Sequence, residues 1–157
     1  MIDFAAKIGL FNKNGDYLVS SPHLKNEIIM AYYISKKLKT DFNSAIDRVT
    51  ETLKDEGFGI ISTINLQEKL KEKLGVDYRK YTILGACNPG FAYEALQLED
   101  KIGTMLPCNV IVQELDDDEV EVAAINPVDS MQAVNNPQLD EVAGDVKLML
   151  SKAIDRL

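Results

Sequence analysis

Two cysteines are the residues of this sequence whose type and setting could do chemistry. Cys87 ends the apolar stretch of residues 81–86 and is followed by Asn88-Pro89, where a helical pattern begins. Cys108 is followed by Asn109, at the start of another apolar stretch. A thiol at a helix N-terminus meets unpaired N–H donors and the positive end of the helix dipole, which both favour the thiolate. Cys87 is therefore a candidate reactive thiol.

A structural role explains the same residues without any chemistry. Asparagine accepts hydrogen bonds from the free N–H groups of a first helical turn, and proline fits the first helical position, so Asn88-Pro89 is a helix-start device. A free cysteine just before such a cap packs as a small apolar residue. Asn109 has the parallel interpretation of a polar residue at a strand end. Both interpretations stay open, because spacing alone does not separate a reactive thiol from a packed one.

A thioredoxin-like redox site would need both thiols. The order strand, cysteine, proline, helix resembles the thioredoxin arrangement, but Gly90 stands where a Cys-x-x-Cys pair has its second thiol. Cys108 would then be the resolving partner of Cys87, brought near by the fold. The two could equally form one pocket, a disulfide, or two ligands of a soft metal completed by a second chain. Two cysteines without histidine do not complete a tetrahedral zinc site, so we predict no metal and no cofactor.

Other reaction classes lack their residues. The sequence contains no GxGxxG, P-loop, HExxH or GxSxG motif. Its single histidine, His23, precedes the regularly patterned part of the chain. Serine–histidine and cysteine–histidine nucleophile pairs are therefore excluded unless His23 folds back onto the domain.

The charge and composition limit the partners. The 157 residues carry a net charge of −8, and a surface of that sign repels a phosphate backbone, so nucleic-acid binding is not expected. The longest apolar runs have only a few residues, whereas a membrane helix needs about 20. Two cysteines are too few for a disulfide framework, which predicts reduced thiols and a cytoplasmic location.

Hydrophobic periodicity predicts nine elements in the order β-α-β-α-β-α-β-β-α. The strands are expected at residues 32–39, 59–64, 81–86, 109–115 and 120–125, and the helices at 42–53, 67–74, 91–98 and 139–157. The last helix is the clearest, because its apolar residues recur without a break at helical spacing. The order predicts an α+β fold with a mixed five-stranded sheet and helices packed on it.

Residues 1–29 differ from the rest. They contain turn signals, among them Asn14-Gly15 in a hairpin-like context, but no sustained period, and their acidic and basic residues balance. We predict an appendage before a domain that covers 30–157, with Met30 as a candidate natural start.

Three stretches of the domain resemble the DUF302 family of bacterial and archaeal proteins of unknown function. They are EGFGIISTINL (56–66), LKEKLGVDYRKYTILGACNP (70–89) and IGTMLPCNVIVQE (102–114), and the terminal helix follows them. The resemblance implies a small α+β domain that pairs as a homodimer. It implies no activity, cofactor or catalytic residue.

The function expected from these observations is a homodimeric module that binds a small molecule or another protein. A thiol-dependent redox protein using Cys87 with Cys108 is the alternative. A dimer is also expected because the terminal helix covers only part of a five-stranded sheet, which leaves apolar surface for a partner. Cys87, Cys108, Asn88 and Asn109 should lie together at one end of the sheet, beside the helix that begins at Asn88.

Overall fold

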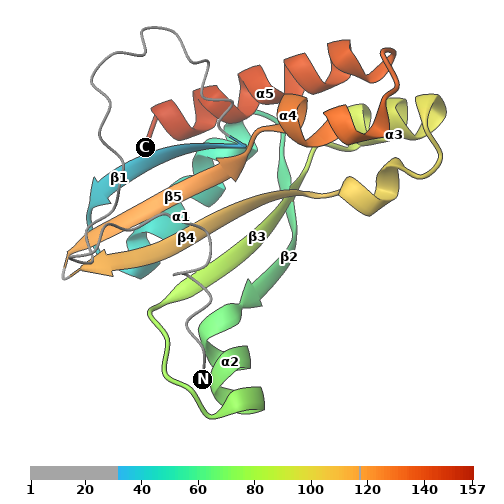
Figure 1. Cartoon of the computed structure of the whole chain (residues 1–157). Helices are drawn as coiled ribbons and strands as arrows, with labels where there is room; N and C mark the ends of the chain where they lie inside the picture. The colour runs from blue at the N-terminus through green and yellow to red at the C-terminus, as the bar shows by residue number, and fades with distance from the viewer. Residues whose placement is uncertain (1–31, 117) are drawn as a thin grey trace, which may run out of the picture.

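The described part of the chain forms one antiparallel sheet with helices packed against one of its faces (Figure 1). The computed structural model describes residues 32–116 and 118–157. The five strands lie in the order β1-β5-β4-β3-β2, so β1 and β2 are the two edges. The hairpin-like segment around Asn14-Gly15, and His23, lie outside the described residues.

Five strands and five α-helices follow one another along the described residues. The strands are β1 (Tyr33–Lys39), β2 (Gly59–Asn65), β3 (Tyr81–Cys87), β4 (Cys108–Asp116) and β5 (Glu119–Ile125). The helices are α1 (Phe42–Asp55), α2 (Leu66–Leu74), α3 (Pro89–Leu98), α4 (Pro127–Met131) and α5 (Leu139–Asp155), with short 3-10 turns at Ile102–Met105 and Gln132–Val134.

Local sequence signals explain where the first two helices begin and end. The Asp41 side chain accepts a hydrogen bond from the Ser44 N–H and caps α1, and the Asn65 side chain caps α2 through the Glu68 N–H. Past the C-terminus of α1, Gly57 has a φ of 82°, and Gly75 ends α2 with a φ of 69°. Positive φ favours glycine, which is why the chain turns at these two positions.

The α+β class and the five strands are confirmed, but the pairing differs from the mixed sheet that we expected. All four strand pairs are antiparallel. A helix between two strands suggests a parallel crossover. Here α2 and α3 each join antiparallel neighbours instead, as long excursions beyond the ends of the sheet. The β1-α1-β2 connection does relate two parallel strands, but they lie at opposite edges.

The sequence has two further Asn-Pro pairs, Asn126-Pro127 and Asn136-Pro137, and the first of these also starts a helix. The Asn126 side chain accepts a hydrogen bond from the Val128 N–H at the start of α4, a helix that the sequence analysis missed because it is only five residues long. Asn136 is not the cap of α5. It accepts from the Gln138 N–H and donates from its amide to the Leu98 carbonyl at 3.1 Å, so it ties the chain before α5 to the end of α3.

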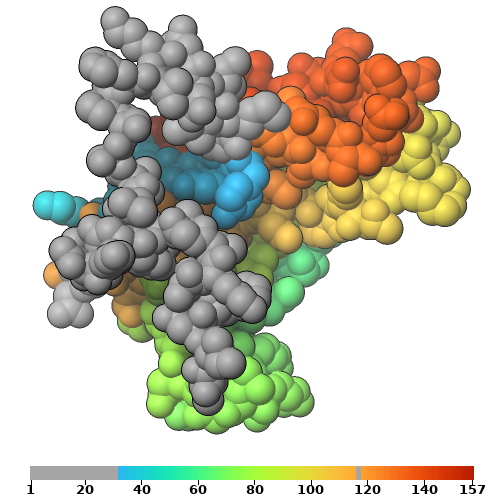
Figure 2. Space-filling model, in the orientation of Figure 1, coloured from blue at the N-terminus to red at the C-terminus, as the bar shows by residue number. Residues whose placement is uncertain are grey.

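The hydrophobic core lies between the sheet and the layer made by α1 and α5. Alternate residues of the central strands are buried there, such as Val110, Val112, Val120 and Val122. Helix α2 stands away from this layer and projects beyond one end of the sheet (Figure 1), where it forms part of the green lobe at the bottom of Figure 2. Within residues 32–116 and 118–157 no helix is long and apolar enough to cross a membrane.

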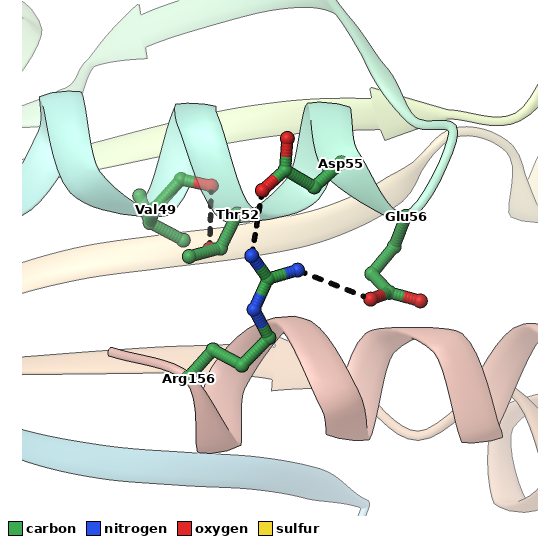
Figure 3. Close-up of polar contacts among 5 residues, drawn as sticks. All are labelled: Val49, Thr52, Asp55, Glu56 and Arg156. Atoms are coloured by element: carbon green, nitrogen blue, oxygen red, sulfur yellow. Dashed lines mark hydrogen bonds and ion pairs between the residues drawn. The ribbon is translucent and has the colours of Figure 1, made fainter.

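Arginine side chains join the C-terminal end of α5 to α1 through hydrogen bonds and ion pairs. Arg156 donates to the Asp55 carboxylate at 2.7 Å and to the Glu56 carboxylate at 3.3 Å, beside the Thr52 hydroxyl that donates to the Val49 carbonyl (Figure 3). Arg48 donates to the Leu157 carbonyl at 2.6 Å. Positive side chains near the C-terminal carbonyls of a helix also complement its dipole.

Candidate functional site

Cys87 and Cys108 come from neighbouring strands at the same end of the sheet. Cys108 is the register partner of Ala86, and Cys87 is the next residue along β3. Asn88 follows at once as the cap of α3, with Pro89 in the first turn. The helix therefore begins at the end of the sheet where both cysteines lie.

The two thiols line one small apolar pocket between the sheet end, α3 and α5. Its other walls come from the segment before β2, the Leu106-Pro107 segment and α4. The lining residues are Phe58, Ala86, Cys87, Asn88, Phe91, Ala92, Ala95, Leu106, Pro107, Cys108, Met131, Val142 and Val146. The cavity volume is about 20 Å³, which has room for one water molecule at most. The pocket as it stands does not accommodate an organic ligand.

Burial opposes a reactive thiolate at Cys108. Its side chain is 8% exposed. Burial, with the neighbouring Cys87 as a second cause, raises the pKa of the Cys108 thiol from 9.0 to about 11. Cys87 is half-buried, and neither cysteine forms a disulfide.

The helix start beside Cys87 already has a partner for its donors. The Asn88 side-chain oxygen accepts from the Gly90 N–H at 3.1 Å and from the Phe91 N–H at 3.4 Å. These are the groups that would otherwise stabilise a thiolate at this helix end. Asn88 therefore acts as a cap.

Gly85 lets three segments meet next to the pocket. A Cβ atom on this glycine would lie 2.2 Å from the Ser62 hydroxyl oxygen of β2 and 2.7 Å from Cγ of Pro107. The peptide bond before Pro107 is cis. The close approach of β2 and of the segment before β4 to β3 requires a residue without a side chain at this position.

Asn109 does not join the other three candidate residues. It follows Cys108 in β4, so its side chain points to the opposite face of the sheet and is exposed there. No helix of residues 32–116 and 118–157 packs on that face, which we call the open face, and it carries a separate hollow of about 380 Å³. Its lining residues are Tyr32, Tyr33, Tyr81, Asn109, Ile111, Gln113, Glu121, Ala123, Ala124 and Ile125.

Polar and aromatic groups are gathered around the open-face hollow. The Gln113 amide donates to the Glu121 carboxylate at 2.7 Å. Burial, followed by the influence of Tyr78 and Tyr32, raises the pKa of the Tyr81 hydroxyl. The Arg79 guanidinium lies 5.5 Å from the centre of the Tyr78 ring. The strand alternation of Asn109, Ile111 and Gln113 is the sequence signal that could have located this surface.

A metal centre is not formed by the described part of the chain. No group of three or more histidine, cysteine, aspartate or glutamate side chains comes together within residues 32–116 and 118–157. The two cysteines would need ligands from elsewhere to hold a soft metal.

Comparison with known proteins identifies the family. The model of the family described as "Domain of unknown function DUF302" matches residues 34–157. The crystal structure of the uncharacterized conserved protein DUF302 from Bacillus stearothermophilus is similar, with a TM-score of 0.75 and 31% sequence identity over 80% of this chain and 98% of that chain. No curated protein matches the sequence. The chain therefore belongs to the DUF302 family.

Proposed function

We propose that this protein is a cytoplasmic homodimeric module that binds a small molecule on the open face of its sheet. The observation that carries the proposal is the hollow of about 380 Å³, against about 20 Å³ at the thiols. Small-molecule sites commonly have volumes of about 300–1,000 Å³ and combine apolar walls with a few polar groups. Tyrosine rings, the Asn109 amide and the Glu121 carboxylate supply that combination here.

Backbone NMR with a library of small fragments tests the binding site. We expect the amide signals of Asn109, Ile111 and Gln113 to shift on fragment binding. Ala123→Trp should fill the hollow and abolish these shifts, whereas Leu148→Trp, on the exposed side of α5, should leave them unchanged.

Two results would contradict this location. Shifts gathered at Phe91 to Ala95, around the thiols, would move the binding site to the cysteine pocket. A library without any binder would contradict small-molecule binding on this surface. Native mass spectrometry of the same protein reports the dimer and any bound molecule in one measurement.

A thiol-dependent redox protein is the second candidate. One observation favours it: Cys87 and Cys108 line the same pocket. The raised pKa of Cys108 opposes it, because a resolving thiol attacks as the thiolate. A reversible disulfide between the two cysteines, formed in a glutathione redox buffer and found by peptide mapping, would establish this alternative.

A further inference from the structure

The two edges of the sheet differ in how they are protected against pairing. The β1 edge has the sequence YISKKLK, with three lysines, and charged side chains of this kind keep an edge strand from pairing with another chain. The β2 edge has the sequence GIISTIN and carries no charge and no proline. Within residues 32–116 and 118–157 no strand lies on the outer side of β2.

Large apolar side chains accompany the unprotected edge. Ile61 is 65% exposed and Ile64 is 45% exposed. The pairing of β2 with β3 shifts between Ile60 and Ser62, so Ile61 forms a bulge and the regular run of the edge is Ser62 to Asn65. No other strand of residues 32–116 and 118–157 pairs with the outer side of this run, so an incoming strand can add there, and the bulge places Ile61 at the margin of such a contact.

The charges at the two ends of β2 have opposite signs. Residues 51–56, at the end of α1 just before the strand, hold three acidic side chains and one basic side chain. Arg156 of α5 pairs with Asp55 and Glu56, so this end of the strand keeps a net charge of −1, from three acidic and two basic side chains. Residues 66–80, in α2 and the segment after it, hold five basic and three acidic side chains. If β2 pairs antiparallel with an identical β2, the basic end of each copy lies beside the acidic end of the other. Parallel pairing would bring like charges together instead.

We propose that β2 of one copy pairs antiparallel with β2 of a second copy along Ser62 to Asn65, which joins the two sheets into one continuous sheet. The contact is two-fold symmetric, as most dimer contacts are, because the same strand serves on both sides. This inference rests on the proposed homodimer and names its surface. The open-face hollow lies on a face of the sheet, so ligand binding there does not depend on the edge contact.

Lysine substitutions at the edge test the contact by light scattering coupled to size-exclusion chromatography. The wild-type protein should be a dimer at micromolar concentration. Ile61→Lys and Ile64→Lys, which copy the protection of the β1 edge, should each raise the dissociation constant at least tenfold. Leu148→Lys changes an equally apolar side chain that is 55% exposed on α5, and should leave the dimer intact.

Hydrogen exchange of the wild-type protein gives a measurement that needs no variant. Backbone amides of Ser62 to Asn65 that face outward should exchange more slowly in the dimer than after dilution to the monomer, whereas β1 amides should be unaffected. A dimer that resists both edge variants, or protection that appears only elsewhere, would overturn the β2 contact but keep the homodimer. A monomeric wild-type protein would overturn both.

Discussion

Two effects act in opposite directions on thiol ionisation at this site. The helix N-terminus beside Cys87 favours a thiolate, and burial of Cys108 disfavours it. A helix dipole favours a thiolate by about 0.3–1 kcal/mol at an exposed site, but the Asn88 cap already occupies the nearest donors. Burial acts in the opposite direction and raises the pKa of Cys108 to about 11. The apolar setting therefore decides the behaviour of Cys108.

Alkylation in the folded protein should reflect this balance. At pH 8 we expect Cys108 to stay unmodified by iodoacetamide while the protein is folded, because about 0.1% of a thiol with this pKa is ionised. Peptide mapping should find it modified only after unfolding. Rapid labelling of native Cys108 would show that the thiol is accessible and support the redox alternative.

The same thiol makes stability depend on pH. Its pKa is higher in the folded protein than the ordinary 9.0, so its contribution to stability is complete below pH 9 and is lost as the pH rises towards 11. Chemical denaturation between pH 8 and pH 11 should therefore show a steeper loss for the wild-type protein than for Cys108→Ala. Equal slopes for the two proteins would mean that Cys108 titrates alike in both states.

Gly85 gives a third prediction at the residue scale. Gly85→Ala should lower the free energy of unfolding by about 1–3 kcal/mol, since the new Cβ would meet the Ser62 hydroxyl oxygen at 2.2 Å. Adding Ser62→Ala should restore part of that loss. Gly144→Ala is the matched control, because nothing lies within 4 Å of its Cβ position, and it should be neutral or stabilising. No loss in Gly85→Ala would contradict the close approach.

Single residues were partly predictable from the sequence. The pattern of apolar residues places the end of one strand at Cys87 and the start of another at Cys108. It therefore predicts that Cys87, Asn88 and Cys108 lie at the same end of the sheet. Asn109 was grouped with them wrongly, because consecutive residues of a strand face opposite sides. The walls of the thiol pocket were not predictable, since Phe58, Met131 and Val146 come from distant parts of the chain.

At the scale of elements, the three Asn-Pro pairs show how far a local signal reaches. Asn88 and Asn126 cap helices through their side chains, whereas Asn136 lies two residues before the cap position of α5. An Asn-Pro pair thus predicts that a helix begins nearby and places its first residue to within about one helical turn. Strand pairing is not local, and the antiparallel sheet could not be predicted from helices that connect its strands.

Removing the cap of α3 should affect both stability and the thiol. Asn88→Ala should lower the free energy of unfolding by about 1 kcal/mol, because it leaves the Gly90 and Phe91 N–H groups without their acceptor. Loosening of this first turn should also speed alkylation of the adjacent Cys87. Asn88→Asp keeps the acceptor and should retain most of the stability. Equal losses in the two variants would point to a role of the amide nitrogen instead.

For the whole molecule, the described residues 32–116 and 118–157 contain the five strands and their buried core, and the family match covers 34–157. The prediction that residues 1–29 form an appendage stays a prediction. A chain that begins at Met30 should unfold cooperatively with a midpoint close to that of the full chain. A large drop in the midpoint would make the first 29 residues part of the folded domain.

The strand order also sets when this fold can form during synthesis. β1 is made first, yet its partner in the sheet is β5, which leaves the ribosome only after almost the whole domain has been made. Until then β1 has no partner among the strands of residues 32–116 and 118–157, and its lysines act as gatekeepers that oppose aggregation of the unpaired strand. β2, β3 and β4 can pair as they emerge from the ribosome. The sheet is completed by β5 and the core is covered by α5, so both steps come late in synthesis. A nascent chain halted before β5 should therefore hold a partial sheet and remain sensitive to proteases.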